Sequence, residues 1–156
     1  MTTARKAADD HLELRSLIGL LKLASLINRP MLENVAAPES LSLNELRVMM
    51  SLAGEGRAAA HDLVVVLGMH PMAVSRAVSA LREDGRIVEA RDPENRRRKV
   101  LALTDAGWAA HGAMLPKAEQ VATRLFSALS DGERRTIRGL LEKLTARLED
   151  WPGDAA

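Results

Sequence analysis

The residues with the clearest chemical pattern lie between His70 and Gly85. Pro71 suits the first turn of a helix, where a missing N–H costs nothing, and Gly85 suits the position just after a helix end. One side of this predicted helix carries small polar, thioether and cationic side chains and no carboxylate: Met72, Ser75, Arg76, Ser79 and Arg82. Hydroxyl and guanidinium groups on such a helix can reach bases and phosphates in the major groove of B-form DNA. We therefore predict that this face, with His70 before it, contacts DNA.

The opposite side of the same helix is apolar, with aliphatic side chains at helical spacing: Val74, Ala77, Val78 and Leu81. A second apolar stripe runs from about Ala59 to Leu67, and Gly68 then supplies the positive φ of a sharp interhelical turn. The two stripes together predict a helix-turn-helix. Taken alone, they fit an ordinary αα-hairpin equally well.

A basic hairpin follows. Two short β-capable runs, 86–91 and 100–103, flank a turn rich in Asp, Pro and Asn, and four cations at 96–99 come just after its tip. An isolated charge run is usually a solvated face. Because this run projects beside a helix face without carboxylates, phosphate and minor-groove contacts are the better interpretation. The candidate contacts are Arg96, Arg97 and Arg98.

These segments resemble the MarR family of bacterial transcriptional regulators. The resemblance is carried by Val74-Ser75-Arg76, by residues 81–88, and above all by Asp92-Pro93-Glu94-Asn95-Arg96-Arg97 followed by residues 101–107 (LALTDAG). It implies a winged helix-turn-helix whose terminal helices form a dimer. Two residues depart from the family pattern: Asn95 stands where Asp is usual in the wing, and Ala73 replaces a common Thr.

Helices are also predicted on both sides of this segment. A helix over about 10–29 is apolar around much of its circumference, Pro30 should kink or end it, and 34–40 reads as a loop. Ser42 and Glu45 form a capping box for a helix to about Ala53. Thr104 is a predicted N-cap for a helix to about 129, and a second capping box, at Ser130, opens a last helix that stops at Pro152-Gly153.

The predicted fold is therefore mainly α-helical with a small β-hairpin wing and about six helices. We expect one continuous domain with three regions: a dimerisation helix and loop (1–40), the winged helix-turn-helix (41–104) and C-terminal dimerisation helices (105–156). The terminal helices carry more apolar surface than such a domain can cover, which indicates a partner. A second copy is the simplest partner, because a two-fold dimer places two recognition helices on successive major grooves of a palindrome. Packing within a monomer is the alternative.

The resemblance further implies a small effector, often aromatic or anionic, that releases the dimer from double-stranded DNA. Candidate contacts are His11, Arg15, Met49, Trp108 and His111. Arg15 can pair with a carboxylate, Trp108 can stack on a ring, and a His can hydrogen-bond a phenol or acid. Each also has a plainer interpretation: a Trp or Met at helical spacing is usually core, and an Arg near a terminus is usually solvated.

Composition narrows the function classes. The 156 residues contain no Cys and carry a formal net charge of +1, so a disulfide framework, a thiolate metal site and a cysteine redox switch are excluded. Nothing in the sequence suggests a metal site or cofactor, an enzyme motif, a signal peptide or a membrane span, so we expect a cytoplasmic protein that is not an enzyme. The resemblance to the MarR family implies that it is a transcriptional repressor. The alternative is a winged-helix protein-interaction module whose basic wing meets an acidic partner.

Overall fold

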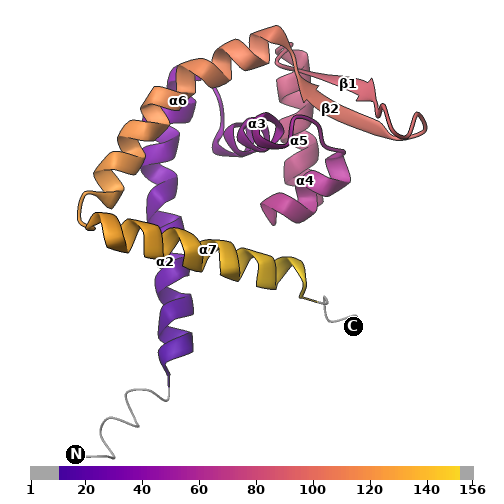
Figure 1. Cartoon of the computed structure of the whole chain (residues 1–156). Helices are drawn as coiled ribbons and strands as arrows, with labels where there is room; N and C mark the ends of the chain where they lie inside the picture. Colours follow the sequence, from indigo (N-terminus) through magenta and orange to yellow (C-terminus); the bar gives the residue numbers. More distant parts are fainter. Residues whose placement is uncertain (1–10, 152–156) are drawn as a thin grey trace, which may run out of the picture. The chain divides into compact units, whose positions relative to one another are not determined.

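The computed structural model describes residues 11–151. Within them the chain forms six α-helices and one two-stranded antiparallel hairpin (Figure 1), which confirms the predicted fold class. The chain divides into two compact units, residues 1–118 and 119–156, and each is described separately. The helix start predicted near residue 10 and the stop predicted at Pro152 and Gly153 lie outside the described residues.

The first helix, α2 (Leu12–Met31), contains Pro30 and ends at the next residue. The loop predicted for 34–40 is wrong, because the chain continues as a π-helical turn, η1 (Leu32–Ala36), and a 3-10 turn, η2 (Ala37–Glu39). Burial favours the compact winding, since Val35 and Ala36 are both fully buried. The Asn34 side-chain amide also donates to the carbonyl of Pro30 at 3.0 Å.

Three helices build the core of the first unit: α3 (Leu43–Glu55), α4 (Ala60–Leu67) and α5 (Pro71–Glu83). The capping box is present at the start of α3, where the Glu45 N–H donates to the Ser42 hydroxyl at 3.2 Å and the Ser42 N–H donates to the Glu45 carboxylate at 3.1 Å. Gly68 turns the chain with a φ of 57°. The helices pack on one another through fully buried side chains, among them Leu46, Met49, Leu52, Leu63, Val74 and Leu81.

The predicted hairpin is confirmed as strands β1 (Ile87–Arg91) and β2 (Lys99–Leu103), paired from Ile87 opposite Leu103 to Arg91 opposite Lys99. Its buried side chains are Ile87, Val100, Leu101 and Leu103. Ala58 forms an isolated antiparallel β-bridge to β2, because Ala58 and Leu101 exchange backbone hydrogen bonds of 3.2 and 2.8 Å. In Figure 1 the turn of the hairpin lies at its free end, away from α5. The tip of the turn projects from the hairpin, while Arg98 at its end reaches Asp62 on α4.

The last two helices are α6 (Asp105–Phe126) and α7 (Asp131–Glu149). Thr104 begins α6 as predicted: its hydroxyl accepts from the Gly107 N–H at 3.1 Å and donates to the Gly85 carbonyl at 2.6 Å. The helix ends at Phe126, slightly before the predicted 129, and the capping box of Ser130 and Glu133 opens α7 as predicted. None of the helices between residues 11 and 151 is both long and apolar enough to span a membrane.

Candidate nucleic-acid interface

The predicted DNA-contact face is the solvent side of α5. Met72 is 56% exposed, Ser75, Arg76 and Arg82 are also exposed, and Ser79 is half-buried. The other side of α5 is buried through Val74, Ala77 and Leu81. The structure therefore places the five predicted contacts on the face that solvent can reach, and the buried residues hold that face in position.

His70 begins the recognition helix as its N-cap. The ring nitrogen Nδ1 accepts a hydrogen bond from the backbone N–H of Met72 at 3.2 Å, and Pro71 follows at the first helical position. A ring that accepts at Nδ1 carries its proton at Nε2, so the exposed side of His70 presents a donor. The cap was not predicted, because the usual N-cap signal is Ser, Thr, Asp or Asn.

The cations of this face are available for an anionic partner. In the part of the chain that the structure describes, no carboxylate lies within 4.0 Å of the guanidinium of Arg76 or Arg82. Both side chains lie on α5 before its only carboxylate, Glu83. A DNA phosphate or base acceptor would therefore meet these cations without first displacing a protein carboxylate.

Of the four cations of the wing, two pair with carboxylates and two have no carboxylate partner within residues 11–151. Lys99 pairs with Glu89 across the two strands at 2.7 Å, and this hydrogen bond lowers the pKa of the Glu89 carboxyl below its ordinary value. Arg98 pairs with Asp62 and lies 3.9 Å from Asp92. Within residues 11–151, Arg96 and Arg97 have no carboxylate partner, and both are exposed.

Arg98 joins the wing to the helix-turn-helix. Its guanidinium reaches Asp62 on α4, and the same Asp62 oxygen accepts the backbone N–H of Ala59 at 3.2 Å at the start of that helix. Sequence reasoning assigned Arg98 to DNA and missed both carboxylates, since no local spacing links residues 62 and 98. Contact of Arg98 with DNA stays a prediction, and its contacts within the chain are structural.

The turn of the wing is shaped by two short side chains. The Asn95 side-chain oxygen accepts from the Arg97 N–H at 3.2 Å, and Asp92 accepts from the Glu94 N–H at 3.0 Å. The Arg98 N–H also donates to the Asn95 carbonyl at 2.8 Å. Asn95 thus orders the turn through its amide oxygen, and Asp62 and Asp92 supply the carboxylates that meet an Arg.

Comparison with known proteins agrees with this geometry. Residues 41–99 match the model of the MarR family. A solved structure of BpsR from Bordetella bronchiseptica superposes with a TM-score of 0.69 at 25% identity, covering 83% of this chain and 98% of that one. The chain carries a MarR-family winged helix-turn-helix over residues 41–99. It is accordingly a DNA-binding transcriptional regulator with a winged helix-turn-helix.

Two named relatives are regulators as well. The HTH-type transcriptional repressor NicR of Pseudomonas putida is 25% identical over 80% of this chain and 79% of the repressor. A putative regulatory protein for the hcr operon of Thauera aromatica is 35% identical, over 59% of this chain and 55% of its own length. The MarR family consists of transcriptional regulators rather than enzymes.

The predicted effector residues are partly brought together. The rings of Trp108 and His111 meet edge to face, with centroids 5.8 Å apart, and Trp108 is 46% exposed. His11 and Arg15 are exposed, one turn apart at the start of α2. Met49, a residue of α3, is fully buried in the core. Their role toward an effector stays a prediction.

No group of three or more His, Asp or Glu residues with metal-binding geometry occurs among residues 11–151.

Arg86 is a further residue that sequence reasoning did not single out. Its Nη2 donates to the Glu39 carbonyl at 2.8 Å, and its Nη1 is buried without a partner in the described chain. Glu39 in turn pairs with Lys117 of α6 at 3.1 Å. These contacts tie the end of α5 to the segment before α3.

Proposed function

We propose that this MarR-family chain is a repressor that binds a palindromic operator as a homodimer and is released by a small aromatic or anionic effector. The observation that carries the proposal is the carboxylate-free face of α5 beside a wing whose Arg96 and Arg97 have no carboxylate partner within residues 11–151. A helix of this kind enters the major groove, and a basic wing meets phosphates and the minor groove.

The DNA contacts follow from exposure. On α5 we assign them to Met72, Ser75, Arg76, Ser79 and Arg82, preceded by His70, and on the wing to Arg96 and Arg97. Arg98 is assigned a second role, in which it keeps the wing at a fixed angle through Asp62. Phosphate contacts set the register on the duplex, and contacts to base edges set the sequence preference.

The dimer is supported by apolar surface that one chain leaves exposed. No side chain of α2 or α7 is fully buried, yet both helices carry large aliphatic residues. Exposed by 39–67% are Leu12, Leu14, Leu17, Ile18, Leu20, Leu21, Leu23 and Leu26 on α2, and Leu140, Leu141, Leu144 and Leu148 on α7. So many exposed aliphatic side chains are typical of a subunit interface, so we assign regions 1–40 and 105–156 to dimerisation.

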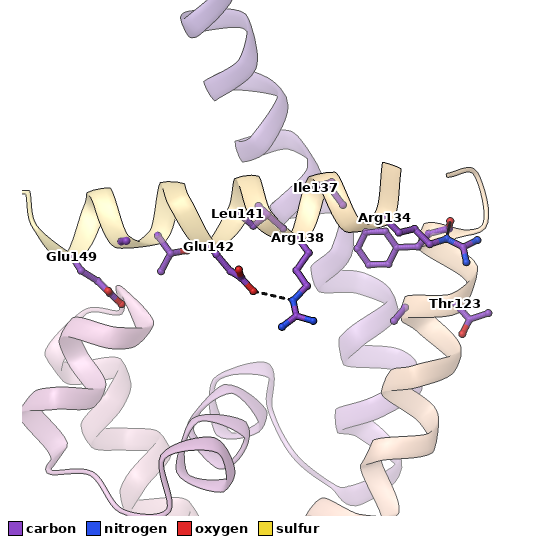
Figure 2. A pocket seen from close by; sticks show the side chains of 11 residues that line it. Thr123, Arg134, Ile137, Arg138, Leu141, Glu142 and Glu149 are labelled. Atoms are coloured by element: carbon purple, nitrogen blue, oxygen red, sulfur yellow. Dashed lines mark hydrogen bonds and ion pairs between the residues drawn. The ribbon is translucent and has the colours of Figure 1, made fainter. Parts of the chain in front are cut away.

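The second unit also contains a groove suited to a helix of another copy (Figure 2). It has a volume of about 790 Å³ and lies between the end of α6 and α7, with apolar lining from Phe126, Ile137 and Leu141. Arg138 and Glu142 pair with each other at 2.9 Å along its edge. An apolar strip with a charged edge resembles the core and rim of a protein interface.

The effector class is supported by the relatives. DNA binding by BpsR is regulated by 6-hydroxynicotinic acid, an aromatic acid, and NicR is named a repressor. In this chain, Arg15 would pair with the carboxylate, and the exposed Trp108 beside His111 would contact the ring. An effector releases DNA only if it binds more tightly to the dimer geometry that DNA does not favour.

The DNA-binding proposal is tested on the promoter region beside the chain's own gene. We expect selective binding there, and a steep loss of affinity between two salt concentrations, because several phosphate contacts release counterions. Binding that is equally strong on unrelated duplexes, or absent, would overturn the repressor and favour the protein-interaction module with an acidic partner.

The effector proposal is tested by thermal melting with 6-hydroxynicotinic acid and related aromatic acids. A ligand of the folded dimer raises the melting temperature with concentration, and the same acid should release the promoter duplex. Arg15→Ala should abolish both responses, and Lys22→Ala, on the same helix, should retain them. Equal responses of the two variants would remove Arg15 from the effector site.

A further inference from the structure

Met72 is an unusual residue for the exposed face of a DNA-binding helix. It lies at the second position of α5 and is 56% exposed, and its thioether sulfur is only a weak hydrogen-bond acceptor. Its backbone is fixed, because its N–H donates to the ring of His70 at the helix start. The helix therefore presents a large apolar side chain at its leading end, where a recognition helix meets base edges.

The major groove offers one apolar group to such a side chain. Guanine, adenine and cytosine present hydrogen-bond acceptors and donors there, and only thymine presents a methyl group, at C5. Resting on the proposed function, we infer that Met72 reads a thymine in each operator half-site through contact with this methyl group. Met72 would then be a specificity-determining residue of the repressor.

Arg76 predicts the distance between the thymine and a second base of the half-site. It lies one turn after Met72 on the same face, is exposed, and has no carboxylate partner among residues 11–151. Four residues advance a helix by about 6 Å, which corresponds to about two base pairs of B-form DNA. An unpaired Arg favours the O6 and N7 atoms of guanine. Each half-site should therefore contain a thymine and a guanine about two base pairs apart.

Thymine recognition is tested by removing only the methyl group. Operators selected by the full chain from randomised duplexes are remade with uracil in place of single thymines, which keeps base pairing and every hydrogen-bond group. We expect one thymine per half-site at which uracil weakens binding by the wild-type chain about fourfold, the effect of one methyl group leaving an apolar contact. Thymines elsewhere in the duplex serve as controls.

Two variants assign the effect to Met72. Met72→Ala should bind the thymine and uracil duplexes equally, whereas Met72→Leu, which keeps an apolar side chain, should retain the discrimination. Selective operators at which no uracil substitution matters, or at which Met72→Ala still discriminates, would overturn the inference and leave the proposed function intact. Failure to select any operator would overturn the proposed function itself, and with it the inference.

Discussion

At the scale of single residues, position 107, just after the end of the wing, requires a glycine because the chain passes close to it. A Cβ at this position would overlap the carbonyl oxygen of Arg86 and lie 3.2 Å from the Leu103 side chain. The close approach lets Thr104 bond to both the Gly85 carbonyl and the Gly107 N–H. Glycine therefore joins α6 to the end of the recognition helix.

Gly107→Ala should lower the free energy of unfolding by about 1–3 kcal/mol, because backbone must move to admit the methyl group. Denaturant unfolding followed by circular dichroism measures this. Gly112→Ala is the matched control in the same helix: a Cβ there meets nothing within 4 Å, so the variant should gain up to about 1 kcal/mol from helix propensity. A Gly107→Ala protein as stable as the control would contradict the assigned contact.

Arg97 and Arg98 are neighbours with different expected roles. Arg97→Ala should weaken binding to every duplex and reduce the slope of log affinity against log salt by about one, since it removes a phosphate contact. Arg98→Ala should also weaken binding, but with an unchanged slope, because it releases the wing from Asp62.

The Arg98 effect has its own control. If Arg98 acts through Asp62, then Arg98→Ala combined with Asp62→Asn should bind DNA no more weakly than Arg98→Ala alone, as expected for two residues of one interaction. Additive losses, or a salt slope that falls for Arg98→Ala as it does for Arg97→Ala, would show that Arg98 contacts DNA directly.

At the scale of elements, the sequence was most informative where local chemistry decides the outcome. The capping boxes at Ser42 and Ser130, the Gly68 turn and the hairpin follow from neighbouring residues, and all are present. The segment 34–40 was predicted wrongly, because Pro38 suggests a loop, whereas burial of Val35 and Ala36 by distant residues keeps it helical. Pairing of Arg98 with Asp62 likewise depends on the fold and has no local signal.

The start of α7 should be sensitive to acid. The backbone N–H of Ser130, and then its hydroxyl, hydrogen-bond the Glu133 carboxylate and lower its pKa below the ordinary 4.5. The charged form is therefore favoured in the folded chain, so its contribution is complete above about pH 4.5 and is lost as the pH falls through the lowered value. We expect α7 to fray at its first turn in this range.

Melting temperatures of the wild type and Glu133→Gln, measured from pH 7 to pH 3, test this expectation. Glutamine keeps an acceptor but has no charge to lose, so the stability advantage of the wild type should shrink below pH 4.5. A difference between the two proteins that stays constant with pH would contradict the role of the carboxylate charge.

At the scale of the whole molecule, the proposed binding to a palindromic operator depends on a second copy of the chain. The leucines of α2 and α7 and the groove beside Phe126 are exposed apolar surface within their own units. Two copies related by a two-fold axis would present two α5 faces to successive major grooves. The helical periodicity of apolar residues predicted this exposed apolar surface. The distance between the two recognition helices depends on a partner chain and an effector, which one sequence does not specify.

The central claim is tested most directly by the mass of the complex between the chain and a selected palindromic duplex, measured by sedimentation equilibrium. The account predicts two chains per duplex and a dimer without DNA. Leu144→Glu, which places a charge in the apolar stripe of α7, should give a monomer that binds the duplex weakly. A single wild-type chain bound per palindrome, or a wild-type monomer that binds as tightly as the dimer, would contradict the account.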